Sequence, residues 1–297
     1  MDFDNSWKAL LKPGEATNFF DVNNPQGFQV AASEYSKINA WWLAELSRLI
    51  YKEEGDEAGN KSKGSSRNHI LEKVNLREVR FFDNDGTQCA LIESQDAVND
   101  FTILVFRGTN ELKDWLANVC IVPAKWPKGG FVHTGFKNAL EKIWGAVNEH
   151  LSSINSPIFY TGHSLGSALA TLAAAKRPPR AVYTFASPRV GNNEFVRTLT
   201  DIKIYRVVNN RDIVTTTPPS VWPFDYRHVG ELHCIAHDTR MMINPTEQTV
   251  TAARQKTERS LENAANYRRW FDPPEFLSDH APVNYVAHLE RQVFQGL

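Results

Sequence analysis

A serine between two glycines separates two short segments that are typical of a strand and a helix. Residues 157–161 read Pro-Ile-Phe-Tyr-Thr, an apolar run that suits a buried strand, and residues 167–175 are small, apolar and helix-forming. Between them, residues 162–166 read Gly-His-Ser-Leu-Gly. A strand that turns directly into a helix brings the two backbones almost into contact, so only glycine fits at the two outer positions. The sequence therefore predicts a tight, strained turn with Ser164 at its apex.

Such a turn has the local structure of a nucleophile elbow, in which a serine hydroxyl is held out into a cleft. The backbone amide of Leu165 would lie at the helix N-terminus, where N–H groups and the helix dipole stabilise developing negative charge. The pattern G-x-S-x-G is short and also occurs by chance in loops, but the strand and helix around it favour a catalytic serine. We therefore expect Ser164 to be a nucleophile and Leu165 to donate to an oxyanion.

Composition limits the class of protein further. The 297 residues carry a formal net charge of −1 and no basic block, so a nucleic-acid partner is not expected. No run of about 18 apolar residues is present, so no transmembrane segment is expected. Three widely spaced cysteines (Cys89, Cys120 and Cys234) and an acidic start without an apolar signal region favour a reducing, cytoplasmic location. A secreted protein is the alternative if the N-terminus is trimmed.

Apolar runs alternate with helical stripes along most of the chain. Helices are predicted at residues 31–51 and 136–151, strands at residues 101–106, 158–161, 181–185 and 202–208, and a hairpin at residues 79–92. This alternation predicts an α/β-hydrolase fold with a mostly parallel central sheet flanked by helices. We expect one domain over residues 1–297, with its core at about 75–290, a polar loop at 55–68 and a polar helical insertion at 246–270.

A serine nucleophile needs a base and an orienting acid, which follow it in the order Asp or Glu, then His, in α/β-hydrolases. Asp212 comes just after the predicted strand at residues 202–208, at the carboxyl end where active-site residues lie. Asp201 precedes that strand and so lies at the wrong end, while Asp225 and Asp238 follow weaker strands. We therefore expect Asp212 to be the acid.

The base is harder to choose from the residues alone. Five histidines follow the predicted acid: His228, His233, His237, His280 and His288. His280 lies in a loop that Pro282 stiffens, but nothing in the residues ranks it decisively above His228. His163 is next to the serine but points to the opposite side of the strand, which makes it a poor base. Residues 228–237 lack the helical setting of a zinc motif, so neither a metal nor a cofactor is expected.

These motifs together resemble the class 3 lipases, the fungal triacylglycerol lipase-like family of α/β-hydrolases. The matching segments follow the family's order at residues 105–109 (oxyanion strand), 113–116 (lid), 132–136, 161–166 (elbow), 185–191, 209–214, 226–230 and 279–280. The resemblance implies Ser164, Asp212 and His280 as the catalytic triad and places His228 in a structural strand. It also implies that the amide and hydroxyl of Thr109 join the Leu165 amide in the oxyanion hole. The first 70 residues and residues 246–270 depart from the family's pattern.

The segment that follows the oxyanion strand has the pattern of a short amphipathic helix. Leu112, Trp115, Leu116 and Val119 recur at spacings of three and four and form its apolar face. The pattern alone fits an ordinary helix packed on the core equally well. Its position and the resemblance favour a lid over residues 110–122, which would cover the serine when closed and meet a lipid surface when open.

The sequence therefore predicts a serine esterase or lipase that hydrolyses acylglycerol esters, at a lipid–water interface, through an acyl-enzyme intermediate and without a cofactor. Two alternatives stay open at this stage. The first is a phospholipase A1 or galactolipase with the same triad, because head-group preference depends on loops. The second is a non-catalytic lipid-binding protein on a hydrolase scaffold. The sequence does not indicate an oligomeric state.

Overall fold

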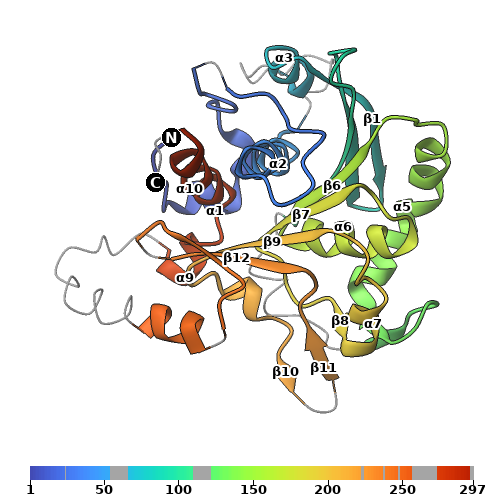
Figure 1. Cartoon of the computed structure of the whole chain (residues 1–297), viewed down its shortest axis with the longest axis vertical. Helices are drawn as coiled ribbons and strands as arrows, with labels where there is room; N and C mark the ends of the chain where they lie inside the picture. The colour runs from blue at the N-terminus through green and yellow to red at the C-terminus, as the bar shows by residue number, and fades with distance from the viewer. Residues whose placement is uncertain are drawn as a thin grey trace.

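The computed structural model describes residues 1–23, 25–53, 66–109, 122–221, 224–236, 238–246, 248–255 and 273–294. Its centre is an eight-stranded sheet in the order β1-β2-β3-β6-β7-β9-β12-β13 (Figure 1). The strands are β1 (Leu76–Asn84), β2 (Thr87–Ser94), β3 (Thr102–Phe106), β6 (Ile158–His163), β7 (Ala181–Phe185), β9 (Ile204–Asn209), β12 (Glu231–Ile235) and β13 (Met241–Ile243). The five strands from β3 to β12 are parallel, and the pairings at both edges are antiparallel. The predicted, mostly parallel α/β sheet is therefore confirmed.

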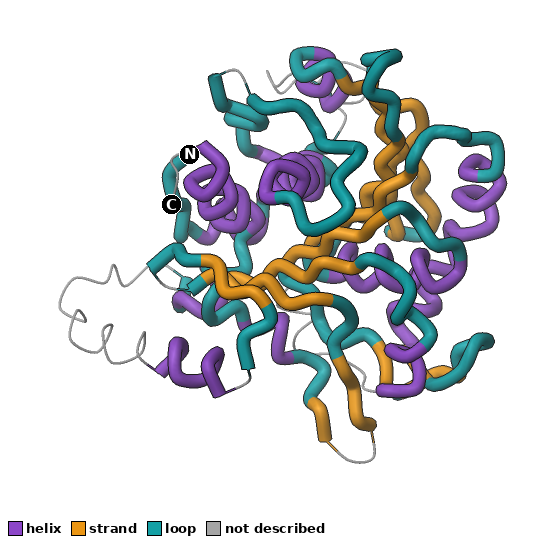
Figure 2. Tube along the Cα trace, viewed as in Figure 1, coloured by secondary structure: helices purple, strands orange, loops and turns teal. Residues whose placement is uncertain are grey.

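Helices cover both faces of this sheet, as Figure 2 shows in purple against the orange strands. The four large helices are α2 (Lys37–Leu49), α5 (Thr134–Leu151), α6 (Leu165–Lys176) and α10 (Pro282–Phe294). The first and last of these pack together on one face, and the middle two pack on the other (Figure 1). Alternation along a strand supplies both cores, since Val105 points to the α2 side and Leu104 to the α6 side. All of β3 is buried, as predicted for a strand covered on both faces.

Shorter elements complete the described chain. A second, antiparallel sheet in the order β10-β11-β8-β5-β4 comprises β4 (Pro123–Lys125), β5 (Phe131–His133), β8 (Gly191–Asn192), β10 (Ser220–Val221) and β11 (Phe224–Arg227). The remaining helical segments are α1 (Trp7–Leu11), η1 (Pro13–Glu15), α3 (Arg67–Glu72), α7 (Asn193–Arg197), η2 (Ile213–Thr216), residues 248–255 and α9 (Glu275–Ser278). Of these, η2 follows the carboxyl end of β9 and α9 comes just before His280, so both lie beside the candidate site.

Several predicted boundaries shift for local reasons. The helix predicted over residues 31–51 begins only at Lys37, because Ser36 Oγ accepts a hydrogen bond from the Asn39 amide (3.1 Å) and caps the helix there. The polar loop predicted to reach residue 68 ends earlier, since Ser66 caps α3, and residues 54–65 lie outside the described part. The predicted hairpin is confirmed as β1 and β2. The predicted insertion is helical at residues 248–255, while residues 256–272 lie outside the described part.

A buried ion pair fastens the N-terminal segment to α2. Arg48 Nη2 lies 2.9 Å from Glu45 Oε2, and both side chains are almost completely buried. Arg48 also donates to the Asn18 carbonyl (2.8 Å), while Glu45 accepts from the Phe20 amide (3.0 Å). Burial raises the pKa of Glu45, and Arg48 opposes that rise. The pair therefore holds residues 18–20 against the helix from two directions.

Replacing Arg48 with methionine should lower the free energy of unfolding by about 3–5 kcal/mol, because Glu45 would stay buried without its cation. Urea unfolding followed by circular dichroism measures this difference. The matched control is Lys12→Met, which breaks the exposed pair with Glu15 (2.9 Å) and should change stability by less than about 1 kcal/mol. Equal effects for the two variants would contradict a structural role of the buried pair.

Candidate active site

Ser164 occupies the turn between β6 and α6 in a strained conformation. Its φ of 58° and ψ of −125° lie in a region that residues with side chains rarely adopt. A Cβ atom on Gly162 would overlap the backbone of Gly166, and one on Gly166 would overlap the carbonyl of Phe106. The predicted strained turn and its need for two glycines are therefore confirmed.

The two residues predicted for the oxyanion hole lie at the ends of neighbouring elements. Leu165 is the first residue of α6, and the Ser164 side chain makes no capping bond to that helix. Thr109 follows β3, which pairs in parallel with β6 so that Phe106 lies opposite Gly162. Both residues thus come from the carboxyl ends of adjacent strands, where the predicted amides would meet a reacting carbonyl. Their role in an oxyanion hole stays a prediction.

The four residues of the predicted lid face are Leu112, Trp115, Leu116 and Val119. All four lie outside the described residues, because residues 110–121 are not among them. The lid therefore stays a prediction from the sequence.

Asp212 and His280 form a direct, buried pair. His280 Nδ1 donates to Asp212 Oδ2 at 2.9 Å and lies 3.0 Å from Oδ1. The turn after β9 positions Asp212, whose Oδ1 also accepts from the Val214 amide (2.9 Å) at the start of η2. His280 lies between α9 and α10, far along the chain but at the same edge of the sheet. The structure thus pairs the acid with His280, which the residues alone did not rank above His228.

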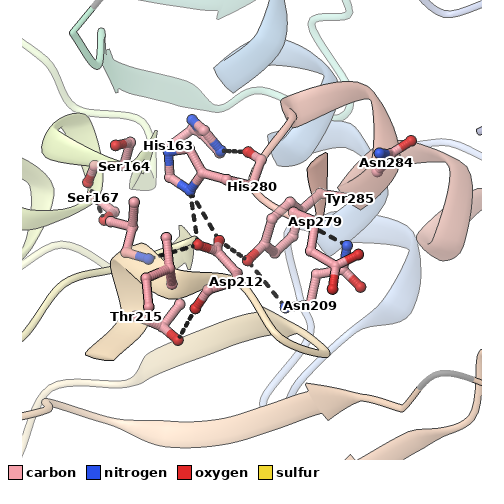
Figure 3. Close-up of polar contacts among 12 residues, drawn as sticks. His163, Ser164, Ser167, Asn209, Asp212, Thr215, Asp279, His280, Asn284 and Tyr285 are labelled. Carbon is pink, nitrogen blue, oxygen red and sulfur yellow. Dashed lines mark hydrogen bonds and ion pairs between the residues drawn. The ribbon is translucent and has the colours of Figure 1, made fainter. Parts of the chain in front are cut away.

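Figure 3 shows Ser164 on the side of the His280 ring that faces away from Asp212. The Ser164 hydroxyl is buried and has no hydrogen-bond partner among the residues that the structure describes. In enzymes, the hydrogen bond between a nucleophile and its base often becomes short only when substrate is bound. The three side chains are therefore in the spatial order that acyl transfer requires, with the histidine between the acid and the hydroxyl.

A tyrosine that the sequence analysis missed holds the acid in place. Tyr285 on α10 donates its hydroxyl proton to Asp212 Oδ2 (2.7 Å) and accepts a hydrogen bond from the Asn209 amide (3.0 Å). Burial raises the pKa of Tyr285 well above its usual value, and the Asp212 charge raises it further, so the phenol stays protonated. No local pattern indicates this role, because it depends on how α10 packs against the end of β9.

If Ser164 is the nucleophile, replacing Tyr285 with phenylalanine should lower kcat by about tenfold and leave KM nearly unchanged, because one charge-assisted hydrogen bond to Asp212 is lost. Steady-state kinetics across pH 5–9 would measure the change. A shift in the pH profile distinguishes loss of acid positioning from a purely structural defect. The matched control is Tyr226→Phe, on a strand of the small sheet, which should keep both kinetic constants.

His163 reaches the site although it precedes the serine on the strand. Strand alternation predicts that it points away from Ser164, yet its ring centroid lies 4.6 Å from that of His280. Its Nε2 donates to the His280 carbonyl (2.8 Å), so its Nδ1, 3.2 Å from the Tyr51 hydroxyl, accepts from that group. Burial and the nearby His280 lower the pKa of His163 well below its usual value, so the ring stays neutral. With both nitrogens occupied, His163 is not available as the base.

The same contacts link three parts of the site in a single chain of hydrogen bonds. The Gly108 amide, one residue before Thr109, donates to the Tyr51 oxygen. Tyr51 then donates to His163, and His163 donates to the main chain of His280. The oxyanion strand, the elbow and the loop of the base are therefore connected through a tyrosine from the N-terminal segment.

Asp279, the neighbour of the base, is a half-buried carboxyl group near the acid. Its Oδ2 accepts from the Arg211 amide (3.0 Å) and lies 3.3 Å from the Asn210 side-chain nitrogen. Burial raises the pKa of Asp279 to about 7, the Arg211 amide opposes the rise, and the Asp212 charge adds to it. The Asp279 carboxyl therefore titrates near neutral pH, whereas in the unfolded chain it titrates near 3.8.

This shift predicts a pH-dependent stability. Between the unfolded pKa near 3.8 and the folded pKa of about 7, the native Asp279 carries a proton that the unfolded chain has lost. Stability should therefore fall as pH rises through this window, by a few kcal/mol at about 1.4 kcal/mol per unit, and be flat above it. Asp279→Asn should remove this part of the decline when urea unfolding is measured from pH 4 to 8. An unchanged pH dependence in the variant would contradict the assignment.

The other aspartates and histidines weighed as partners lie elsewhere. Asp201 is exposed before β9, Asp225 pairs with Arg227, Asp238 pairs with Arg240, His233 stacks on Tyr35, and His288 contacts Phe3. His237 lies outside the described residues. The resemblance placed His228 in a strand, but pairing with β8 ends at Arg227, so His228 lies just beyond β11. The described residues contain no cluster of metal ligands.

The parallel sheet and the strained serine turn define an α/β-hydrolase. Residues 103–222 match the family described as lipase (class 3). The chain is 32% identical to a lipase of Rhizomucor miehei over 157 residues, which cover 46% of this chain and 42% of that protein. It is 35% identical to secreted mono- and diacylglycerol lipase 1 of Fusarium solani over 158 residues, which cover 48% and 45%. The central part of the chain is therefore similar to class 3 lipases.

A solved lipase structure is similar to this chain as well. The lipase from Rhizopus microsporus var. chinensis superposes with a TM-score of 0.53 at 27% identity, over 61% of this chain and 70% of that one. The chain spans less than half the length of the two curated relatives above. Among the described residues, no helix combines the length and apolar character needed to cross a membrane.

Proposed function

We propose that this protein is a serine lipase that hydrolyses the carboxylic ester bonds of acylglycerols. The observation that carries the proposal is the buried pair of Asp212 and His280 beside a serine on a strained elbow. A neutral histidine oriented by a carboxylate is the base that a serine hydroxyl needs. The match of residues 103–222 to the lipase (class 3) family and the two lipases to which the chain is similar support the same class of substrate.

In the proposed reaction, His280 Nε2 takes the Ser164 proton while the oxygen attacks the ester carbonyl. The amides of Thr109 and Leu165 would stabilise the oxyanion, each by a factor of about 10²–10³ in rate. Collapse of the tetrahedral intermediate expels the alcohol, which takes the proton from His280. Water then adds to the acyl-enzyme by the same steps and releases the fatty acid and the free serine. Asp212 holds the imidazole in the required tautomer throughout.

Labelling with a fluorophosphonate tests the proposal directly. We expect one covalent adduct per chain, located by mass spectrometry on the peptide that contains Ser164, because only an activated serine displaces fluoride. Ser152→Ala, a change at an exposed serine on the far end of α5, should leave labelling intact. Folded protein that resists the reagent would refute the proposal and favour a non-catalytic lipid-binding protein.

A substrate panel then separates lipase from related activities. Rates on dissolved and emulsified esters of graded chain length should rise sharply above the solubility limit if residues 110–122 form a lid. A flat response would contradict interfacial activation and indicate a simple esterase. The rates of hydrolysis of phosphatidylcholine and of a galactolipid would be compared with the rate for triacylglycerol. This comparison would show whether phospholipase A1 or galactolipase activity exceeds the activity on neutral acylglycerols.

A further inference from the structure

A cavity of about 880 Å³ beside β9 is lined by an excess of positive charge. Four arginines line it, Arg189, Arg206, Arg227 and Arg254, against a single carboxylate among the described lining residues. That carboxylate, Asp225, is already bound, since it lies 2.8 Å from Arg227 Nη2 and accepts from the Ser220 hydroxyl. The cavity therefore carries positive charge that its own described residues do not neutralise.

Arg206 is a buried arginine whose charge the described residues leave unopposed. Its side chain is on β9, and the residue is only 8% exposed, yet its Nε has no hydrogen-bond partner among the described residues. Neither residue opposite Arg206 on the neighbouring strands is a carboxylate, because Arg206 is in register with Thr184 on β7 and Leu232 on β12. Burying a guanidinium without an anion is costly, so the arrangement is stable only when something opposes the charge.

The other arginines at the cavity do not compensate the charge of Arg206. Arg189 donates to the Pro218 carbonyl (2.8 Å), and Arg254 Nε donates to the Asn210 carbonyl (3.0 Å). Burial lowers the pKa of Arg206 to about 10, and the charges of Arg189 and Arg254 add to this fall. Arg206 is still a cation at neutral pH, and these guanidinium groups are close enough to repel one another.

A neutral histidine adds an acceptor to the same wall. His228 lines the cavity, and burial together with the arginine charges holds its pKa well below the usual value. Its bond with the Thr215 carbonyl takes the ring N–H, and Nδ1 has no partner among the described residues. A ligand with both anionic oxygens and a P–OH group would satisfy the arginines and this acceptor together.

We propose that the Arg206 cavity binds a phosphate group. Guanidinium groups match the oxygens of a phosphate in bidentate geometry, and its charge of about −1.5 to −2 opposes several cations at once. A carboxylate would oppose only one of them. The volume exceeds that of inorganic phosphate, so a phosphomonoester fits as well. The cavity is distinct from the Ser164 site, although Thr215 and Thr216 on its wall belong to the 3-10 helix that Asp212 caps.

Binding is tested without any activity assay, so the outcome is independent of the proposed hydrolase function. The ligands are inorganic phosphate and glycerol 3-phosphate, and the controls are chloride and sulfate at matched ionic strength. Calorimetric titration should show saturable binding of phosphate. Thermal unfolding should show a rise in Tm with phosphate that exceeds the rise with either control. Arg206→Met should weaken the phosphate Kd by about tenfold or more. It should also keep or raise the Tm without phosphate, because a buried uncompensated charge is removed.

Arg77→Met is the matched control, because Arg77 is exposed and pairs with Glu93 (3.1 Å) on the β1–β2 hairpin; its phosphate Kd should equal that of the wild type. If Arg206→Met does not fold, Arg254→Met serves in its place. Vesicles that contain phosphatidic acid or phosphatidylcholine distinguish a lipid headgroup from a free phosphate. If the wild type binds phosphatidic acid vesicles and Arg206→Met does not, the ligand is a lipid headgroup. If only the soluble compounds bind, the ligand is a free phosphate. A wild-type protein that responds equally to phosphate and to chloride, or an Arg206→Met protein that binds phosphate normally, would overturn the proposal.

Discussion

Replacing Ser164 with alanine is expected to lower kcat for ester hydrolysis by about 10⁶ while the protein stays folded. Loss of the nucleophile removes the covalent route, and His280 has no serine proton to accept. The strained backbone is unaffected, because alanine keeps the same Cβ atom. The serine hydroxyl has no partner among the described residues, so its removal breaks no hydrogen bond to them and should change the free energy of unfolding by less than about 0.5 kcal/mol.

Steady-state kinetics and urea unfolding of the two proteins would measure both parts of this prediction. Ser152→Ala is the control for a serine-to-alanine change as such. It alters an exposed serine and should keep full activity. Hydrolysis by Ser164→Ala at more than a thousandth of the wild-type rate would be incompatible with the proposed mechanism.

The second large effect is expected at the acid. Asp212→Asn should reduce kcat by about 10⁴, because an amide donor would face His280 Nδ1 and favour the tautomer that carries its proton on Nε2. That tautomer cannot accept the Ser164 proton. The Val214 amide would keep its acceptor on Oδ1, and the Tyr285 oxygen would accept from the new amide nitrogen in place of donating to Oδ2, so the turn should keep its geometry.

Kinetics for Asp212→Asn should therefore show a fall in kcat with little change in KM or in the unfolding midpoint. Asp238→Asn is the matched control, since that exposed aspartate pairs with Arg240 (2.7 Å) and was a competing choice for the acid. Comparable losses in the two variants would indicate that the assignment of Asp212 is wrong. A loss at Asp212 that exceeds the loss at Ser164 would also contradict a shared mechanism.

Local patterns predicted the parts of the molecule that depend on neighbours in sequence. The elbow follows from two glycines around a serine, and the hairpin and β3 follow from turn residues and a continuous apolar run. The position of Asp212 followed from strand polarity in a parallel sheet. In each case the residues that decide the structure lie within about ten positions of one another.

Contacts between distant segments could not be predicted in this way. His280 and His228 were equal choices because their distances to Asp212 depend on how the C-terminal residues fold back. Tyr285 and Tyr51 were missed because hydroxyl contacts through α10 and α2 leave no periodic pattern. Arg206 likewise reads as an ordinary strand residue, and its lack of a carboxylate partner is visible only once β7 and β12 lie beside it.

The hydrogen-bond chain from Gly108 through Tyr51 and His163 to His280 has a consequence for how the site is divided along the chain. The segment that matches the family, residues 103–222, carries Ser164 and Asp212 but neither His280 nor Tyr51. The helices that bring these two residues, α10 and α2, pack on each other over one face of the sheet. The site is therefore completed by segments from both sides of residues 103–222, one before the matched segment and one after it. Removing the segment on either side should therefore abolish the reactivity of Ser164, although residues 162–166 themselves stay unchanged.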